Sequence, residues 1–157
     1  MVSGEWCDRR ALSRRAVIAG AGVVLVMRRV PAVAASDEMQ TAMREALGAL
    51  DLREGRVDLD IPALVENGNS VPLKIVIDSP MTAADHVTDI FVFSPENPLP
   101  NISRFKLGPR CGMGEVTTTI RLATTQHVHV VAVMSDKTQW FATAEVEVTT
   151  AACFDPT

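Results

Sequence analysis

The chain has 157 residues, of which 47% are hydrophobic and 22% are charged, and its formal net charge at pH 7 is −4. This length and composition are typical of one globular domain and leave little room for a second. Without residues 1–35, which hold six Arg and two acidic residues, nine Lys or Arg face 17 Asp or Glu, a formal charge of −8. DNA, RNA and anionic membrane surfaces are bound through clusters of basic side chains, so these partners are excluded.

Residues 1–35 have the layout of an export signal, with a basic segment, an apolar run and small residues before a cleavage point. Arg14 and Arg15 form a twin-arginine pattern before the apolar run at residues 16–27, and residues 32–35 offer the cleavage site. The alternative is a membrane anchor, which needs roughly 20 apolar residues, whereas this run has about 12. We expect a signal peptide that directs the protein to the periplasm by the twin-arginine route, without a membrane anchor.

Residues 36–50 predict one amphipathic helix. Ser36 is a favourable N-cap, and Asp37 and Glu38 suit the positive end of the helix dipole. Apolar residues recur at helical spacing, namely Met39, Ala42, Met43, Ala46, Leu47 and Leu50. We expect this stripe to pack on the core of the same domain; a partner surface is the alternative.

From residue 57 onward the pattern changes to short β-branched runs separated by turn residues. The runs are residues 57–61, 71–77, 86–93, 115–122, 126–134 and 139–148. About six or seven strands at this spacing, with no further helical segment, predict an all-β, immunoglobulin-like sandwich over residues 51–148. The strands should pair antiparallel, because parallel neighbours would need crossover helices that the sequence lacks.

The last run delivers the chain out of the sandwich at about Val148 or Thr149, which leaves residues 149–157 as a short C-terminal arm. No side chain in residues 149–152 is large enough to anchor this segment in a core. Cys153 follows, so at roughly 3.3 Å per residue its thiol can stand up to about 17 Å from the body. A thiol on such an arm can carry a covalent cargo into a partner's active site, because the tether raises its local concentration.

Two alternatives for Cys153 stay open. It can be a small apolar group in a tail, or it can form a disulfide with Cys111, the other cysteine outside residues 1–35. Asp155, two residues further on, should disfavour the reactive thiolate.

A metal site is a further candidate. His127 and His129 alternate on one face of a strand and would supply two metal ligands if His86 or a cysteine joined them. This pattern is more often a solvated strand face, so we expect no metal. The sequence also has no Gly-x-Ser-x-Gly, no His-Glu-x-x-His and no phosphate-binding loop, so we expect no enzyme and no cofactor.

Several segments, taken together, resemble a known family. They are IPALVENG at residues 61–68, VPL at 71–73, FSPENPLP at 93–100, FKLGP at 105–109 and TTIRLA at 118–123, followed by a cysteine beyond the last strand. In this order they resemble SoxY, the sulfur-carrier subunit of the periplasmic thiosulfate-oxidising (Sox) system. The resemblance implies an immunoglobulin-like sandwich that pairs with a second β-sandwich subunit, SoxZ.

The resemblance also implies a role for Cys153. A haem-containing cytochrome complex would load this cysteine oxidatively with a sulfur species, and hydrolase and dehydrogenase partners would then act on it. The haem and metals belong to those partners, so no cofactor is implied here.

The arm departs from the family pattern. The usual arm ends Gly-Gly-Cys-Gly-Gly, whereas here Ala151 and Ala152 precede Cys153 and Phe154 and Asp155 follow it. Glycines make the usual arm slim and flexible, so the change points to a paralogous branch whose arm reads Ala-Ala-Cys followed by an apolar and an acidic residue. A second cysteine, Cys111, is also unusual for the family.

The sequence thus predicts a periplasmic carrier that holds a sulfur intermediate covalently on Cys153 and presents it to partner enzymes of sulfur-compound oxidation. The alternative is a non-catalytic interaction or assembly module derived from a sulfur carrier, with an unloaded or disulfide-bonded arm.

Overall fold

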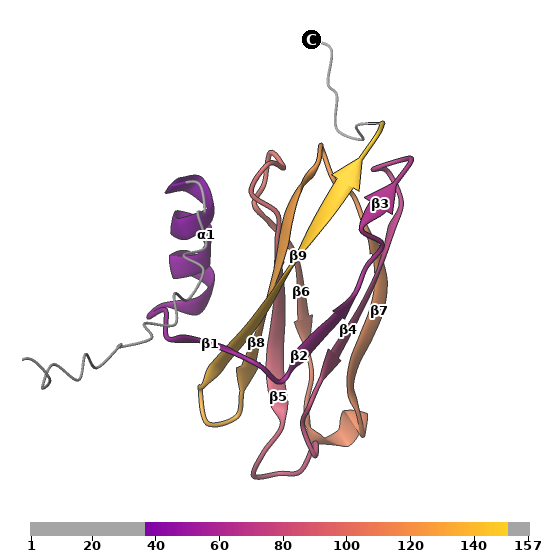
Figure 1. Ribbon diagram of the computed structural model, residues 1–157. Helices are drawn as coiled ribbons and strands as arrows, with labels where there is room; N and C mark the ends of the chain where they lie inside the picture. The colour runs from indigo at the N-terminus through magenta and orange to yellow at the C-terminus, as the bar shows by residue number, and fades with distance from the viewer. Residues whose placement is uncertain (1–36, 151–157) are drawn as a thin grey trace, which may run out of the picture. The chain divides into compact units, whose positions relative to one another are not determined.

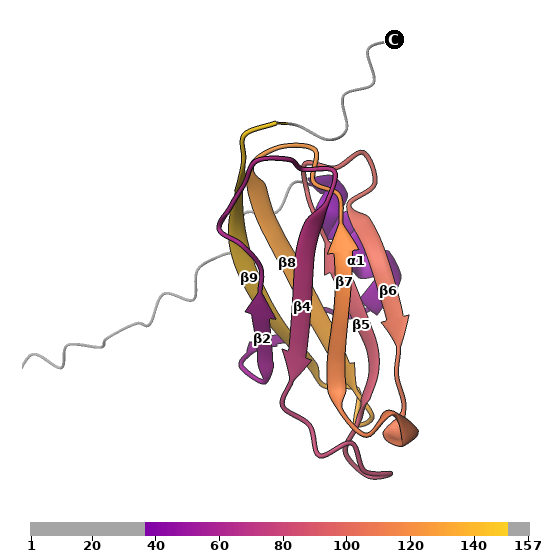
Figure 2. The same cartoon turned by 90° about the vertical axis from the view of Figure 1, so that its right-hand side faces the viewer.

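The computed structural model describes residues 37–150, which form a β-sandwich with one α-helix (Figures 1 and 2). The smaller sheet has three antiparallel strands. β4 (Val71–Ile77) is its centre, with β2 (Val57–Asp60) on one side and β7 (Gly114–Ile120) on the other. Alternate residues of β4 are buried, as expected for a strand that has one face toward a core.

The larger sheet has the strand order β1-β9-β8-β5-β6. Its strands are β1 (Leu52–Glu54), β5 (Val87–Phe93), β6 (Asn101–Lys106), β8 (Gln126–Met134) and β9 (Gln139–Val148), and the short β3 (Leu64–Val65) also pairs with β9. β8 is apolar over most of its length because both of its faces are buried. One face meets the smaller sheet and the other lies on the helix side.

The main core lies between the two sheets. Its buried side chains include Val71, Leu73, Ile75 and Ile77 of β4, Ile90 and Val92 of β5, and Val128, Val130 and Ala132 of β8. Burial of this apolar surface is the main stabilising contribution to such a fold.

The outer face of the larger sheet carries a second apolar cluster made of Phe91, Phe93, Val131 and Phe141. α1 (Asp37–Leu47) lies on the same side of the sheet (Figures 1 and 2) and buries Met39 and Met43. The Gln139 side chain donates a hydrogen bond of 2.9 Å to the carbonyl of Ala49, which fixes the chain just after the helix. The helix therefore packs on its own domain, as the sequence predicted.

The helix ends at Leu47 and not at residue 50. Gly48 has φ of 75°, and its N–H donates to the Arg44 carbonyl at 2.9 Å, which is a left-handed helix cap that favours glycine. The predicted N-cap residue, Ser36, lies outside the described residues.

The predicted antiparallel sandwich is confirmed, with two short exceptions. β1 and β3 run parallel to β9. No crossover helix is needed, because the rest of the sandwich forms the connection between these strands and β9. The sequence reading also missed β6, whose residues are mostly polar because it is an edge strand with one exposed face.

One side of the sandwich is closed and the other is open. On the closed side, residues 52–65 pass from the edge of the larger sheet (β1) to the smaller sheet (β2) and back (β3). On the open side, the sheets end at β6 and β7, and no other strand among residues 37–150 pairs with the free edge of either. The 3₁₀ helix η1 (Pro109–Cys111) lies in the connection between these two edge strands.

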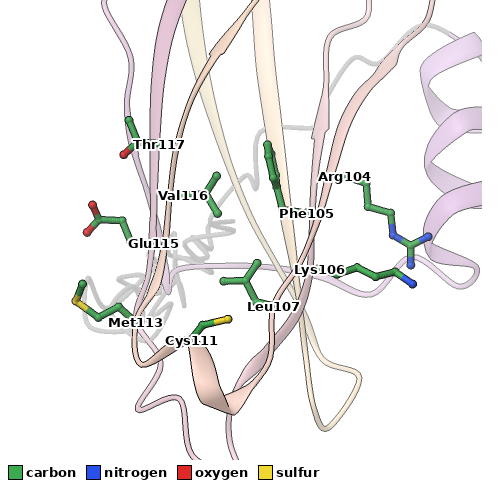
Figure 3. Close-up of a pocket in the computed structure, with 9 residues that line it drawn as sticks. All are labelled: Arg104, Phe105, Lys106, Leu107, Cys111, Met113, Glu115, Val116 and Thr117. Carbon is green, nitrogen blue, oxygen red and sulfur yellow. The ribbon is translucent and has the colours of Figure 1, made fainter.

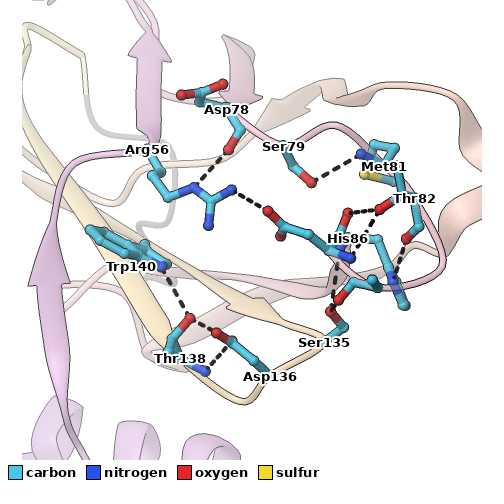
Figure 4. Close-up of polar contacts among 12 residues, drawn as sticks. Arg56, Asp78, Ser79, Met81, Thr82, His86, Ser135, Asp136, Thr138 and Trp140 are labelled. Carbon is cyan, nitrogen blue, oxygen red and sulfur yellow. Dashed lines mark hydrogen bonds and ion pairs between the residues drawn. The ribbon is translucent and has the colours of Figure 1, made fainter.

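The Arg56 side chain contacts three segments at one end of the sandwich (Figure 4). Its guanidinium donates to the Asp78 carbonyl at 2.8 Å, pairs with Asp85 at 2.9 Å, and lies 5.7 Å from the centre of the Trp140 ring. These contacts join the start of β2, the loop after β4 and the start of β9. None of the helical segments in residues 37–150 is both long enough and apolar enough to span a lipid bilayer.

Candidate functional site at the arm-bearing end

The predicted carrier residue, Cys153, lies outside the described residues. So do its neighbours in the predicted arm, Ala151, Ala152, Phe154 and Asp155. The structure instead describes the root from which this segment leaves. β9 ends at Val148, the residue that the sequence indicated, and the chain can be followed to Thr150.

The root extends two residues beyond β9. The N–H of Thr149 donates to the Val65 carbonyl at 3.1 Å, and its hydroxyl donates to the Glu66 carbonyl at 3.0 Å. The carbonyl of Thr150 accepts a hydrogen bond of 3.0 Å from the N–H of Gly68. Residues 149 and 150 are exposed and reach no core, as the sequence indicated, but hydrogen bonds still hold them to the loop at residues 65–68.

Thr125 holds the other side of the root. Its hydroxyl oxygen accepts a hydrogen bond of 2.9 Å from the N–H of Val148. The end of β9 thus contacts two loops, residues 65–68 on one side and Thr125 on the other.

A buried polar cluster stiffens the loops around the root. Asn97 is 8% exposed, and its side-chain oxygen accepts hydrogen bonds from the N–H of Ala123 at 2.8 Å and from the Gln126 amide at 3.1 Å. The Asn97 amide donates to the Arg121 carbonyl at 2.8 Å. The fully buried Ser94 completes the cluster with a 2.5 Å hydrogen bond from its hydroxyl to Gln126.

We call the surface formed by residues 65–70, 94–100, 121–125 and 148–150 the arm-bearing end. Its parts are bonded to each other, since the N–H of Leu122 donates at 2.9 Å to the carbonyl of Gly68. Three of the sequence segments that carry the family resemblance, residues 61–68, 93–100 and 118–123, therefore meet at the place where the chain leaves the sandwich.

Asn97, Thr125 and Gln126 were not singled out from the sequence. The one signal was the position of Asn97 between prolines in a long loop, since such a residue often caps backbone groups. The partners of Thr125 and Gln126 are distant in sequence, so no local pattern identifies them.

Cys111 precedes the start of β7 (Figure 3), whereas Leu122 of the arm-bearing end follows the end of β7, so Cys111 lies at the opposite end of the sandwich. It is exposed and forms no disulfide within residues 37–150. It lines an open hollow of about 550 Å³ between β6 and β7, together with Phe105, Leu107 and Val116.

The three histidines do not form one site. His127 and His129 share the outer face of β8, with ring centres 6.3 Å apart, whereas His86 lies at the opposite end and contacts the Thr82 carbonyl at 3.0 Å (Figure 4). Among residues 37–150, no three His, Cys, Asp or Glu side chains are grouped so that they could hold a metal ion.

The surroundings of His129 clearly perturb its titration. Its ring nitrogen Nδ1 lies 2.9 Å from the Thr143 hydroxyl. Burial, with a smaller effect of the neighbouring His127, lowers the pKa of His129 from 6.5 to about 4. It is therefore a neutral structural residue at neutral pH.

The site is thus a β-sandwich end from which the last strand, bonded on both sides, continues toward Cys153. Comparisons with known proteins assign this sandwich to a class of carrier proteins. The family model described as sulfur oxidation protein SoxY matches residues 43–153. The chain belongs to the SoxY family, and its role is that of a sulfur carrier in sulfur oxidation and not of a catalyst.

Solved structures support this assignment. The sulfur carrier protein SoxY from Chlorobium limicola f thiosulfatophilum is 28% identical with a TM-score of 0.61, and the match covers 72% of this chain and 97% of that chain. No curated protein matches the sequence.

Two superoxide reductase structures share the fold alone. The protein from Ignicoccus hospitalis is 18% identical with a TM-score of 0.52, over 59% of this chain and 78% of its own. A putative superoxide reductase from Thermotoga maritima is 16% identical with a TM-score of 0.53, over 62% of this chain and 93% of its own.

Proposed function

We propose that the protein holds a sulfur intermediate covalently on Cys153 and presents it to partner enzymes of sulfur-compound oxidation. The observation that carries this proposal is the fixed root at Thr149 and Thr150, because a carrier needs a reactive group that is tethered closely to a rigid body. The match to the family model, which reaches residue 153, supports it as well.

The root defines how far the cargo can travel. Cys153 is three residues beyond Thr150, the last of the described residues, which is hydrogen-bonded to the body. Three extended residues span at most about 11 Å, so the thiol reaches less far than the 17 Å estimated when the arm was counted from Val148. A partner's active site must therefore come close to the arm-bearing end.

The loading step is oxidative. With thiosulfate as the sulfur donor, a bond forms between Cys153 Sγ and the outer sulfur of the donor, the thiol S–H bond breaks, and one proton and two electrons are released. A partner cytochrome accepts the electrons. The attacking species is the thiolate, so the environment of Cys153 in the loading complex controls the rate.

We further propose that Cys153 does not pair with Cys111 of the same chain. The root is bonded to Gly68, which is bonded to Leu122 after the end of β7, whereas Cys111 precedes the start of β7. β7 alone spans about 20 Å at 3.3 Å per residue. An arm of about 11 Å and a disulfide Cα separation of about 7 Å together fall short of that distance.

Family membership supports a proposal for the place of action and the partners. We propose export to the periplasm through the twin-arginine signal in residues 1–35, and assembly with a SoxZ-like β-sandwich subunit. A sulfur-oxidising cytochrome and a hydrolase would act on the loaded arm. Two alanines, Phe154 and Asp155 surround the thiol in place of the usual glycines. This favours a branch whose partners have a wider or differently charged active-site channel than the partners of the glycine arm.

Mass spectrometry tests the proposal. Protein isolated from cells that oxidise reduced sulfur compounds should carry sulfur adducts on Cys153, and reductant should remove them. The Cys111→Ser variant should still be loaded, whereas Cys153→Ser should carry no adduct and should not support sulfur oxidation. A bare thiol under all loading conditions, with normal growth of the Cys153→Ser strain, would refute the carrier role and favour an assembly module.

A further inference from the structure

Strand β7 has one free edge in the described part of the chain. β7 pairs with β4 without interruption from Gly114 to Ile120. Its other edge pairs with no strand among residues 37–150, which leaves backbone N–H and C=O groups available along seven residues. Such an edge is a template for pairing with another strand.

The neighbouring edge strand, β6, has features that prevent strand addition, and β7 lacks them. β6 carries Arg104 and Lys106, and its pairing with β5 contains a register shift. β7 has the sequence GEVTTTI, with no proline, no basic residue and no register shift. All of its last five residues are β-branched, which favours an extended strand.

We propose that the β7 edge pairs with β7 of a second copy of this chain. The two strands would run antiparallel about a two-fold axis at Thr117, so that the three-stranded sheets of two molecules join into one sheet. Such an interface is isologous, since each strand offers the same surface to the other.

The sequence of β7 is self-complementary in this register. Gly114 would face Ile120 of the second copy, which places the residue without a side chain opposite a large one. Glu115 would face Thr119, and its diagonal neighbour would be Arg121 of the second copy, so that opposite charges lie within reach. No like charges face each other within the strand pair.

Exposed apolar side chains support the same register. Among residues 37–150, the two most exposed large hydrophobic side chains are Leu99, at 75%, and Met113, at 69%. Leu99 lines a hollow of about 430 Å³ at the end of β7, together with Ile102, Ile120 and Arg121. The proposed register places Met113 of one copy opposite Arg121 of the other, which is at this hollow, and the two-fold axis repeats the contact.

Cross-linking tests the register in the full chain with Cys7, Cys111 and Cys153 changed to Ser. A Thr117→Cys variant places two thiols directly opposite each other at the axis, so mild oxidation should give a covalent dimer. Thr119→Cys is the matched control, because it lies on the same exposed face but about 14 Å from its symmetry mate at 3.4 Å per residue. It should stay monomeric on a non-reducing gel.

Introducing a positive charge at the same positions gives a second test that does not depend on cysteine. Thr117→Lys places two positive charges opposite each other at the axis and should weaken self-association about five-fold, as measured by sedimentation equilibrium. Thr119→Lys places a positive charge opposite Glu115 of the second copy and should not weaken it. Both positions are exposed, so the fold should be retained, which circular dichroism checks.

Three results would overturn the proposal. The first is a monomer at all concentrations with no Thr117 cross-link. The second is equal cross-linking at positions 117 and 119, which indicates random collision. The third is a different protein covering the edge, seen as protection of the Thr117→Cys thiol from alkylation only in a complex with that protein. None of these results bears on adducts at Cys153, so the carrier function is tested separately.

Discussion

The backbone N–H of Gly68 donates a hydrogen bond of 3.0 Å to the carbonyl of Thr150, and the carbonyl of the same glycine accepts one of 2.9 Å from Leu122. A single loop residue therefore joins the end of the last strand to the loop that follows β7. The root of the arm is held by backbone contacts and by the hydroxyls of Thr149 and Thr125, so its properties can be changed without touching the cysteine.

The first prediction concerns the hydroxyl of Thr149, which donates to the Glu66 carbonyl. Thr149→Val removes this donor while keeping the shape of the side chain. We expect a loss of up to about 1 kcal/mol in the free energy of unfolding and faster amide exchange at Gly68 and Thr149. Thr150→Val is the control, because Thr150 contributes its backbone carbonyl; if both variants exchange alike, the hydroxyl has no role in the root.

The second prediction concerns Asn97 at the centre of the buried polar cluster. Asn97→Ala leaves the Ala123 N–H, the Arg121 carbonyl and part of the Gln126 amide without their partner. We expect a loss of about 3 kcal/mol in urea unfolding, because buried polar groups without partners are costly. The exposed Asn101→Ala variant should change stability little, and an equal loss there would contradict this account.

The third prediction concerns pH. The pKa of His129 in the folded protein, about 4, is below the 6.5 of the unfolded chain, so the unfolded chain binds more protons between these values. The contribution of neutral His129 should be complete above about pH 6.5 and should be lost as the pH falls toward 4, by about 3 kcal/mol in total. Denaturant unfolding at several pH values measures this slope.

A matched pair of variants isolates the histidine. His129→Gln should flatten the dependence between pH 4 and 6.5, whereas His127→Gln, at an exposed position, should largely preserve it. An unchanged slope in His129→Gln would show that another group is responsible.

The fourth prediction concerns Arg56, which bonds to Asp78 and Asp85 and stacks over Trp140. Arg56→Met keeps much of the side-chain volume but removes the bonds, so we expect a loss of about 2 kcal/mol. Arg53→Met removes an exposed ion pair with Asp51 and should change stability by less than about 1 kcal/mol. Thermal unfolding of both variants gives the comparison.

The fifth prediction concerns the two cysteines outside residues 1–35. The isolated, adduct-free protein should contain two thiols that react with an alkylating reagent under native conditions, because Cys111 is exposed and the arm is too short to reach it. Mild oxidation should then give no monomer with an internal disulfide. An oxidised monomer whose thiols react only after reduction would contradict the proposal that Cys153 does not pair with Cys111.

The strand core was largely predictable from the sequence. Residues 71–77, 126–134 and 139–148 were identified with the bounds that the structure has, because alternation of β-branched residues is a local signal. The short β1 and β3 and the polar β6 were not, since their pairing depends on neighbours far away in the chain. The end of the helix was missed because a left-handed glycine cap overrides the apolar spacing that continues to Leu50.

The sequence by itself determined the β-sandwich, the position where the last strand ends and the family resemblance with its terminal cysteine, because these depend on local periodicity and on residue order. Only the tertiary structure decided that Thr149 and Thr150 are fastened to the 65–68 loop, that Asn97 and Gln126 share one buried cluster, and that Cys111 lies at the far end from the arm. These relations join residues that are distant in sequence. The backbone groups that hold the root are the same in every residue and leave no signature in the side chains, and the Asn97 and Gln126 side chains meet only in the folded chain.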